Sequence, residues 1–153
     1  MLFYMAIIHN KKASFNFELL ERFEAGMELF GHEVKALKAG RAHLEGARVL
    51  VRGGEVYLVG ATIFAYQEGN SPTTYNPMRN RRLLLNKKEM LQIASAEATK
   101  GLTIVPISVY NKGRKLKLEI AIARGKKMGD KRETIKKRDT NRDVERETKF
   151  KLK

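Results

Sequence analysis

Residues that could perform acid–base or metal chemistry gather between positions 24 and 33. Glu24, Glu28 and the adjacent pair His32 and Glu33 place carboxylates near one imidazole in the sequence, and such groups can transfer protons or bind a metal ion. However, no two of the three histidines stand at metal-ligand spacing on one predicted helix, and no nucleophile motif, P-loop or GxGxxG string accompanies them. We therefore predict no catalytic residue, no metal and no cofactor, and we retain a nuclease that uses Glu24, Glu28 and His32 as a rival hypothesis.

Clusters of lysine and arginine are the more informative chemical feature. The 153 residues include 31 Lys and Arg against 17 Asp and Glu, and the net charge of +14 attracts polyanions, of which nucleic acid is the commonest. Four clusters, at 35–41, 79–82, 87–88 and 112–117, lie where loops, helix starts or strand faces are predicted, so they could follow a phosphate backbone. Tyrosines are interleaved only lightly among them, which favours recognition of RNA shape and backbone over base-by-base reading.

A membrane is the weaker alternative partner. The basic C-terminal segment has no apolar face that could insert into a bilayer, and no stretch of the sequence is long enough to span one. The apolar residues 1–9 lack the basic start and the cleavage site of a signal peptide, so we predict a first strand there. The absence of cysteine fits a reducing compartment, and we expect a cytoplasmic protein.

The C-terminal segment differs in composition from the rest of the chain. Residues 124–153 hold 13 Lys or Arg against 6 Asp or Glu, which is half of the net charge on a fifth of the length. Large apolar residues are too few there to offset ordering costs of about 1–2 kcal/mol per residue, so we predict disorder in the free protein. Residues 130–153 contain no Pro or Gly, and the segment could fold into a helix against phosphates. Its basic helical stripe consists of Arg138, Arg142, Arg146 and Lys149.

The first half of the chain is predicted to contain one helix and several strands. Apolar residues at i, i+4 and i+8 predict a helix over 14–25, and short apolar alternation predicts a strand over 27–37 that is interrupted at Gly31. Two β-branched runs on either side of Gly53-Gly54 predict a hairpin. Residues 67–80 are predicted to be a loop from their composition.

The second half is predicted to contain a capped helix and a second hairpin. Asn86 and Glu89 have the spacing of a capping box, so a helix should begin there and end near Gly101. Alternating residues on both sides of the turn 111–114 predict the hairpin, with Pro106 at an edge or a bulge because it cannot donate to the ladder. Five or six antiparallel strands with two helices between them predict a mainly β fold, a small barrel with one core.

Three separated strings resemble the SmpB family. They are EAGMELFGHEVKALKAGRAHL at 24–44, RRLLLNKKE at 81–89 and RGKKMGDKRETIKKRD at 124–139. The resemblance runs from Asn10 to about Asp139 with the elements in matching order. It implies an antiparallel β-barrel like the oligonucleotide-binding (OB) fold over residues 1–124, with two or three flanking helices and a disordered basic tail over 125–153.

The resemblance also implies partners and a function. A family member binds the tRNA-like domain of transfer-messenger RNA and delivers that RNA to stalled ribosomes for trans-translation. We therefore expect a monomer, one per RNA, whose tail enters the decoding region and the messenger channel of the ribosome and becomes helical there. A ribosomal protein or general RNA chaperone with a basic tail is the alternative, and selectivity for a tRNA-like fold over duplex RNA separates the two hypotheses.

Residue roles follow from the resemblance and from the neighbouring basic clusters. The predicted RNA-binding residues are Glu24, Leu84, Asn86, Lys11, Lys12, Lys35, Lys38, Arg81, Arg82 and Lys87. The predicted ribosome-binding residues of the tail are Gly125, Lys126, Lys127, Asp130, Lys131, Arg132, Ile135, Lys136, Arg138, Arg142 and Arg146.

The sequence departs from the family pattern at three places. The family commonly has a histidine before the Asp-Lys-Arg string, and this chain has Gly129, which cannot stack on a base. A common tryptophan is His32 here, and an arginine-histidine pair near the N-terminus is Ser14-Phe15.

Overall fold

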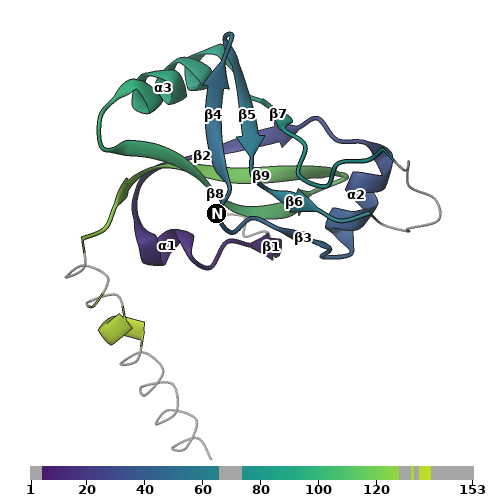
Figure 1. Cartoon of the computed structure of the whole chain (residues 1–153), viewed down its shortest axis with the longest axis horizontal. Coiled ribbons are helices and arrows are strands. Elements are labelled where there is room, and N and C mark those ends of the chain that lie inside the picture. The colour runs from purple at the N-terminus through teal and green to yellow at the C-terminus, as the bar shows by residue number, and fades with distance from the viewer. Residues whose placement is uncertain (1–4, 66–73, 128–131, 133–134, 139–153) are drawn as a thin grey trace, which may run out of the picture.

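The computed structural model of the chain describes residues 5–65, 74–127, 132 and 135–138. Strands predominate among these residues (Figure 1). In chain order the elements are β1 (Ala6–His9), α1 (Ala13–Asn16), β2 (Phe17–Met27), α2 (Gly31–Lys38), β3 (Ala42–His43), β4 (Arg48–Arg52), β5 (Glu55–Val59), β6 (Thr62–Ile63), β7 (Arg81–Leu84), α3 (Lys87–Ala98), β8 (Leu102–Lys112) and β9 (Lys115–Gly125).

One curled antiparallel sheet encloses the main core. Its strand order is β1-β8-β9-β2-β7-β5-β4, and β3 pairs separately with β6. In Figure 1 the β4–β5 hairpin runs across the long strands β2, β8 and β9, and β4 packs against β8. The space between these strands is filled by buried side chains from β4, β5, β7, β8 and β9. They are Val49, Val56, Leu58, Leu83, Ile104, Val109, Leu118 and Ile120. This arrangement confirms the predicted mainly β fold with few helices.

The hairpins form where the turn residues predict them. Gly53 and Gly54 have φ of 57° and 76°, which favours glycine, and Arg52 pairs with Glu55 across the turn. The β8–β9 hairpin is tighter than predicted, because Lys112 already pairs with Lys115. The register of that hairpin shifts between Pro106 and Ser108, so the predicted bulge at the proline is confirmed.

The helix predicted over 14–25 is wrong. Within this stretch only the residues of α1 are helical, and the following residues form β2, which pairs with β9 from Phe17 to Ala25. Apolar spacings of four residues fit an alternating strand as well as a helix, and a bulge between Leu19 and Glu21 obscures the alternation. Burial of Phe23 and Ala25 in the core decides for the strand.

The strand predicted over 27–37 is also wrong, because most of it forms helix α2. The backbone N–H of Phe30 donates to the Glu33 carboxylate at 2.8 Å, which satisfies an N-terminal donor of the helix. Ala36 and Leu37 are buried on the face of α2 that packs into the core. Asn86 caps α3 as predicted, since its side chain accepts from the Glu89 N–H at 2.8 Å.

A buried ion cluster connects α2 to β7 and to the residues before it. The Glu33 carboxylate has no exposed side-chain surface and accepts from Arg79, from Arg81 at 2.7 Å and from the Tyr75 hydroxyl at 3.1 Å. Arg81 also donates to the carbonyl oxygens of Ala61 and Pro77, both at 2.9 Å. This one carboxylate therefore fixes the positions of several segments that are distant in sequence.

The surroundings of Glu33 keep it ionised. Burial alone would raise its pKa, but hydrogen bonds from Arg79, the Phe30 N–H and Arg81 outweigh burial and lower the pKa from 4.5 to about 2. Since the folded pKa lies below the unfolded value, the stabilisation is complete above about pH 4.5 and is lost as the pH falls toward 2.

Replacing Glu33 with alanine should lower the free energy of unfolding by about 3–5 kcal/mol, because Arg81 would remain buried without its counter-charge. Chemical denaturation followed by circular dichroism measures this loss. Over the acid range, Glu33→Gln should lose less stability than the wild type as the pH falls, because glutamine has no carboxylate to protonate.

Glu45→Ala is the matched control, since the Glu45–Lys12 pair is exposed and 3.6 Å long. Its removal should change the free energy of unfolding by less than about 1 kcal/mol. Equal losses for Glu33→Ala and Glu45→Ala would contradict the structural role of the cluster.

Candidate nucleic-acid interface

Strand β2 brings two of the sequence motifs into contact. Gly26 pairs with Leu84 and Met27 pairs with Leu83, so the EAG and LLLN strings form one surface. A Cβ atom at Gly26 would lie 3.2 Å from the Leu84 Cβ, which is closer than most side-chain contacts. Glycine at this position therefore permits the close approach of β7 to β2.

Glu24 lies on this surface with its carboxylate held from two sides. The Tyr110 hydroxyl donates to Oε2 at 2.5 Å and Lys112 Nζ donates to Oε1 at 2.9 Å. The hydrogen bond from Tyr110 lowers the pKa of Glu24 most, followed by the hydrogen bond from Lys112, and partial burial opposes both effects. The side chain is 34% exposed, so Glu24 presents an ionised carboxylate to the outside.

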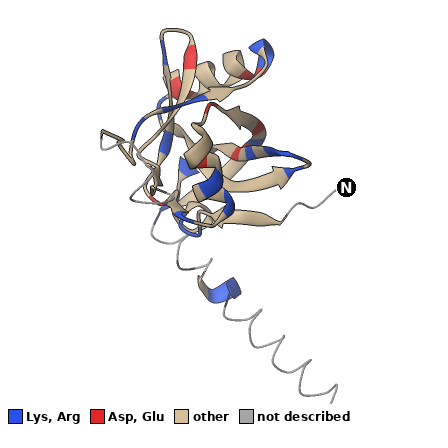
Figure 2. Cartoon of the chain, turned by 90° about the vertical axis from the view of Figure 1, so that its right-hand side faces the viewer, with Lys and Arg blue, Asp and Glu red and all other residues tan. Residues whose placement is uncertain are grey.

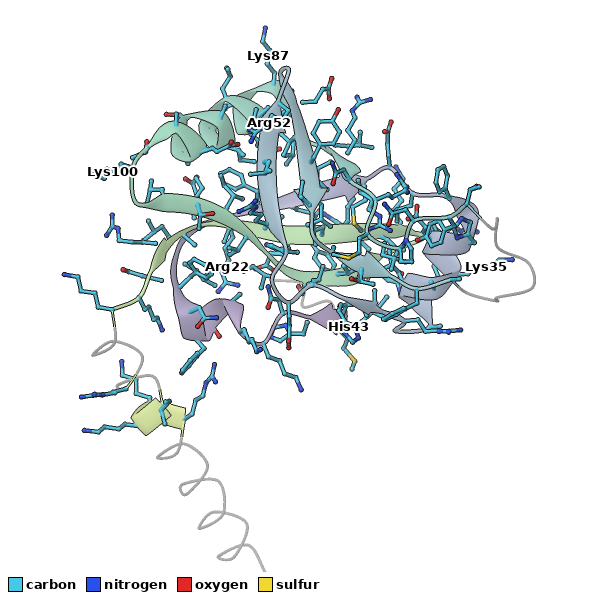
Figure 3. The ribbon with its side chains drawn as sticks, viewed as in Figure 1. Arg22, Lys35, His43, Arg52, Lys87 and Lys100 are labelled. Atoms are coloured by element: carbon cyan, nitrogen blue, oxygen red, sulfur yellow. The ribbon has the colours of Figure 1, made fainter. Side chains whose placement is uncertain are left out.

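Leu84, Asn86 and Lys87 continue the surface from β7 into α3. Leu84 is 45% exposed, which is unusual for a leucine at the end of a core strand. Asn86 uses its Oδ1 for the helix cap, and its Nδ2 has no partner among the described residues. Lys87 is the first residue of α3 and extends into solvent (Figure 3), at the helix end that favours anions.

Further cations lie beyond this end of β2. Lys35 and Lys38 are exposed on α2, the helix on the side that Figure 2 turns toward the viewer, and Figure 3 labels Lys35. Arg82 is half-exposed and forms ion pairs with Glu28 at 3.3 Å and with Glu55 at 2.8 Å. Arg82 Nε has no hydrogen-bond partner, so its contact with Glu55 is an ion pair without hydrogen-bond alignment.

The structure removes Arg81 from the predicted RNA-binding residues. Its side chain is 0% exposed and its guanidinium group is committed to Glu33, Tyr75 and backbone carbonyl oxygens. A phosphate could reach this group only if the ion cluster opened. In the string Arg81-Arg82, the alternation of the strand places the first arginine inside and the second outside.

A second group of predicted residues lies at the other end of β2. Phe17 pairs with Gly125, and the Lys126 N–H donates to the Asn16 carbonyl oxygen at 2.9 Å. Lys126 Nζ donates to the Ser14 carbonyl oxygen at 2.8 Å. The start of the basic segment is therefore tied to α1, beside the exposed Lys11 and Lys12.

Beyond Lys126, the described part of the basic segment is exposed and partly helical. Lys127 is exposed after β9, and Arg132 and residues 135–138, which include Ile135 and Lys136, are helical. Arg138 donates to the Ser14 Oγ at 3.2 Å and lies 5.9 Å from the centre of the Phe15 ring. The predictions for Gly129, Asp130, Lys131, Arg142 and Arg146, and most of the predicted disorder, lie outside the described residues.

The acidic residues near His32 do not form a common site. Glu24, Glu28 and Glu33 pair with Lys112, Arg82 and the Arg79–Arg81 pair, respectively, and the described residues contain no group of three or more His, Asp or Glu suited to a metal ion. His32 instead packs against Phe30 and Tyr75, with ring centres 5.7 Å and 4.6 Å away.

Within the described part of the chain, no helix has the length and apolar character needed to cross a membrane.

The contacts of Tyr110 and Lys112 with Glu24 have no signal in any single sequence motif. Tyr110 lies on β8 and reaches Glu24 on β2 across the intervening strand β9, so only the strand order brings these residues together. Lys112 belongs to a recognised basic cluster, but its contact with Glu24 has no local sequence signal.

Comparison with known proteins supplies the family. The profile of the family described as SmpB protein matches residues 7–150. An SsrA-binding protein of Dehalococcoides mccartyi is 44% identical over 147 residues, covering 96% of this chain and 85% of that protein. An SsrA-binding protein of Mesoplasma florum is 47% identical over 141 residues, covering 92% of this chain and 95% of the relative.

A solved structure agrees with these relatives. It is described as "tmRNA-SmpB: a journey to the center of the bacterial ribosome", and its matching chain is 38% identical, with a TM-score of 0.66. The match covers 79% of this chain and 85% of that one. The chain described here therefore belongs to the SmpB protein family.

Proposed function

We propose that this chain is an RNA-binding adaptor, not an enzyme, which binds the tRNA-like domain of transfer-messenger RNA and delivers it to stalled ribosomes for trans-translation. The observation that carries this proposal is the family match over residues 7–150, together with relatives named SsrA-binding protein and the similar tmRNA-bound SmpB chain. The protein works in the cytoplasm, where ribosomes are found, as one monomer per RNA.

The RNA-binding surface in this proposal is the joined EAG and LLLN region. Glu24, Leu84 and Asn86 lie at its centre, and four exposed or half-exposed cations at its edge contact phosphates. These cations are Lys35, Lys38, Arg82 and Lys87. An acceptor, an exposed apolar side chain and an amide donor amid cations can contact RNA bases and backbone together.

The region around α1 and the basic tail faces the ribosome. Lys126 and Arg138 contact α1, so the tail leaves the barrel from a fixed position beside Lys11 and Lys12. The barrel, residues 1–124, holds the RNA, and the tail, residues 125–153, enters the messenger channel. Its proposed contacts to ribosomal RNA are Gly125, Lys126, Lys127, Asp130, Lys131, Arg132, Ile135, Lys136, Arg138, Arg142 and Arg146.

The two polar atoms of the Asn86 side chain have separable roles. Its Oδ1 caps α3, whereas its Nδ2 is a donor available to RNA. Asn86→Asp should keep the cap and stay within about 0.5 kcal/mol of the wild-type free energy of unfolding, because aspartate caps as well as asparagine. The same variant should weaken RNA binding about tenfold, because a donor becomes a negative charge near phosphates. Fluorescence anisotropy and chemical denaturation measure the two effects.

Ser95→Asp is the matched control, since it adds the same charge on α3 about two and a half turns beyond the cap. It should leave RNA affinity within about twofold of the wild type, because salt screens exposed charges beyond about 10 Å. If Asn86→Asp binds RNA like the wild type, Asn86 does not contact the RNA.

A truncated protein that ends at Gly129 tests the division of labour. It should retain most of its affinity for the tRNA-like domain and its preference over a duplex of equal length, because the barrel surface is intact. It should not support tagging of stalled peptides in a reconstituted translation system, because the tail is needed in the messenger channel.

Two outcomes are decisive for this experiment. Tagging by the truncated protein would show that the tail is dispensable. Equal binding of the full chain to duplex and tRNA-like RNA would favour a general RNA chaperone.

A further inference from the structure

The RNA-binding surface proposed above has an ionised carboxylate at its centre. Phosphates repel a carboxylate and have no hydrogen-bond donor to offer it, so Glu24 is unsuited to the RNA backbone. The donors that an RNA presents are the N–H groups of its bases and the ribose hydroxyl groups. A carboxylate fixed in this place thus selects for a base edge.

We infer that Tyr110 and Lys112 position Glu24 as a rigid acceptor for the Watson–Crick edge of an unpaired guanine in the bound RNA. This inference rests on the proposed function and adds the chemical group that the surface recognises. Tyr110 and Lys112 are positioning residues, since they act through Glu24.

The strand register explains why the carboxylate is rigid. Glu24 on β2 lies opposite Glu119 on β9, and Tyr110 on β8 lies opposite Lys117 on β9, so the Glu24–Tyr110 contact spans three neighbouring strands. Tyr110 is only 8% exposed, so packing holds its ring in place. The short hydrogen bond from its hydroxyl to Oε2, at 2.5 Å, then restricts the rotation of the carboxylate.

Counting lone pairs identifies the base. Each carboxylate oxygen can accept about two hydrogen bonds, and Tyr110 and Lys112 use one on each oxygen of Glu24. One acceptor position therefore remains on each oxygen, side by side. Guanine carries two adjacent donors on its Watson–Crick edge, N1–H and the N2 amino group, whereas uracil carries one N–H and adenine and cytosine carry one amino group each.

Lys112 makes the approach of RNA possible. Its ammonium group balances the charge of Glu24, and Lys117 adds positive potential nearby. The positive charges thus attract the RNA as a whole, while the oriented carboxylate of Glu24 recognises one base. Both lysines belong to the end of the β8–β9 hairpin, which places them beside Glu24 rather than at the tail.

A double-mutant cycle tests the positioning role. With a fluorescent transcript of the tRNA-like domain as the probe, Tyr110→Phe should weaken binding about three- to tenfold and Glu24→Gln about tenfold or more. The double variant should bind within about twofold of Glu24→Gln alone, because Tyr110 acts only through Glu24. Additive losses would overturn the positioning role.

The pH dependence of RNA affinity distinguishes a positioning role of Tyr110 from a purely structural one. Loss of the Tyr110 hydrogen bond raises the pKa of Glu24, so the acid decline in RNA affinity should begin at a higher pH in Tyr110→Phe than in the wild type. Tyr57→Phe, on β5, is the control and should change neither affinity nor pH profile. Coincident acid profiles for the wild type and Tyr110→Phe would contradict the inference.

Base replacements in the RNA test whether Glu24 recognises a guanine. Each unpaired guanosine of the tRNA-like domain is replaced singly by inosine, which keeps N1–H and lacks the N2 amino group. One replacement should weaken wild-type binding about three- to tenfold and leave Glu24→Gln binding unchanged. If no inosine replacement weakens the wild type, guanine recognition is wrong, and the proposed function stands on its own binding data.

Discussion

Strand β2 is paired along both of its edges, and this pairing fixes the distance between the two ends of the molecule. Its residues Phe17 to Ala25 pair with β9, and its last two residues pair with β7. Gly26 lies nine residues after Phe17 along the strand, a distance of roughly 30 Å at about 3.3 Å per residue. The start of the basic tail and the EAG–LLLN surface are therefore held at opposite ends of one strand. The proposed division, with RNA bound at one end and the tail leaving from the other, requires this fixed separation.

The ion cluster around Glu33 sets a second constraint with a functional consequence. It holds α2 and the residues before β7 in place, and it withdraws Arg81 from the surface. Buried ion pairs often add little net stability, but removal of one partner is costly. The cluster therefore keeps Lys35, Lys38 and Arg82 in fixed positions by fixing the elements that carry them, whereas Glu24, Tyr110 and Lys112 fix a charge at the surface.

Local sequence signals predicted those parts of the fold that are decided locally. Gly53-Gly54 predicts its hairpin and Asn86 with Glu89 predicts the start of α3, because turn and cap geometry depend on a few adjacent residues. The assignments for β2 and α2 were wrong, because pairing with β9 and the contacts of Glu33 come from distant parts of the chain. Likewise, the sequence groups Arg81 with Arg82, and only the fold separates a buried arginine from an exposed one. Sequence motifs indicate the candidate RNA-binding residues, whereas the contact of Tyr110 with Glu24 depends on the strand order β8-β9-β2.

Amide chemical-shift mapping of the isotope-labelled chain, during titration with the tRNA-like domain, shows whether RNA binds at only one end of β2. The largest changes should occur at residues 24–26, 84–88 and 110–112, at one end of β2. Residues 11–16 and 125–127, at the other end, should change little. Largest changes at α1 and the start of the tail, or equal changes at all exposed lysines, would contradict the separation of the two surfaces.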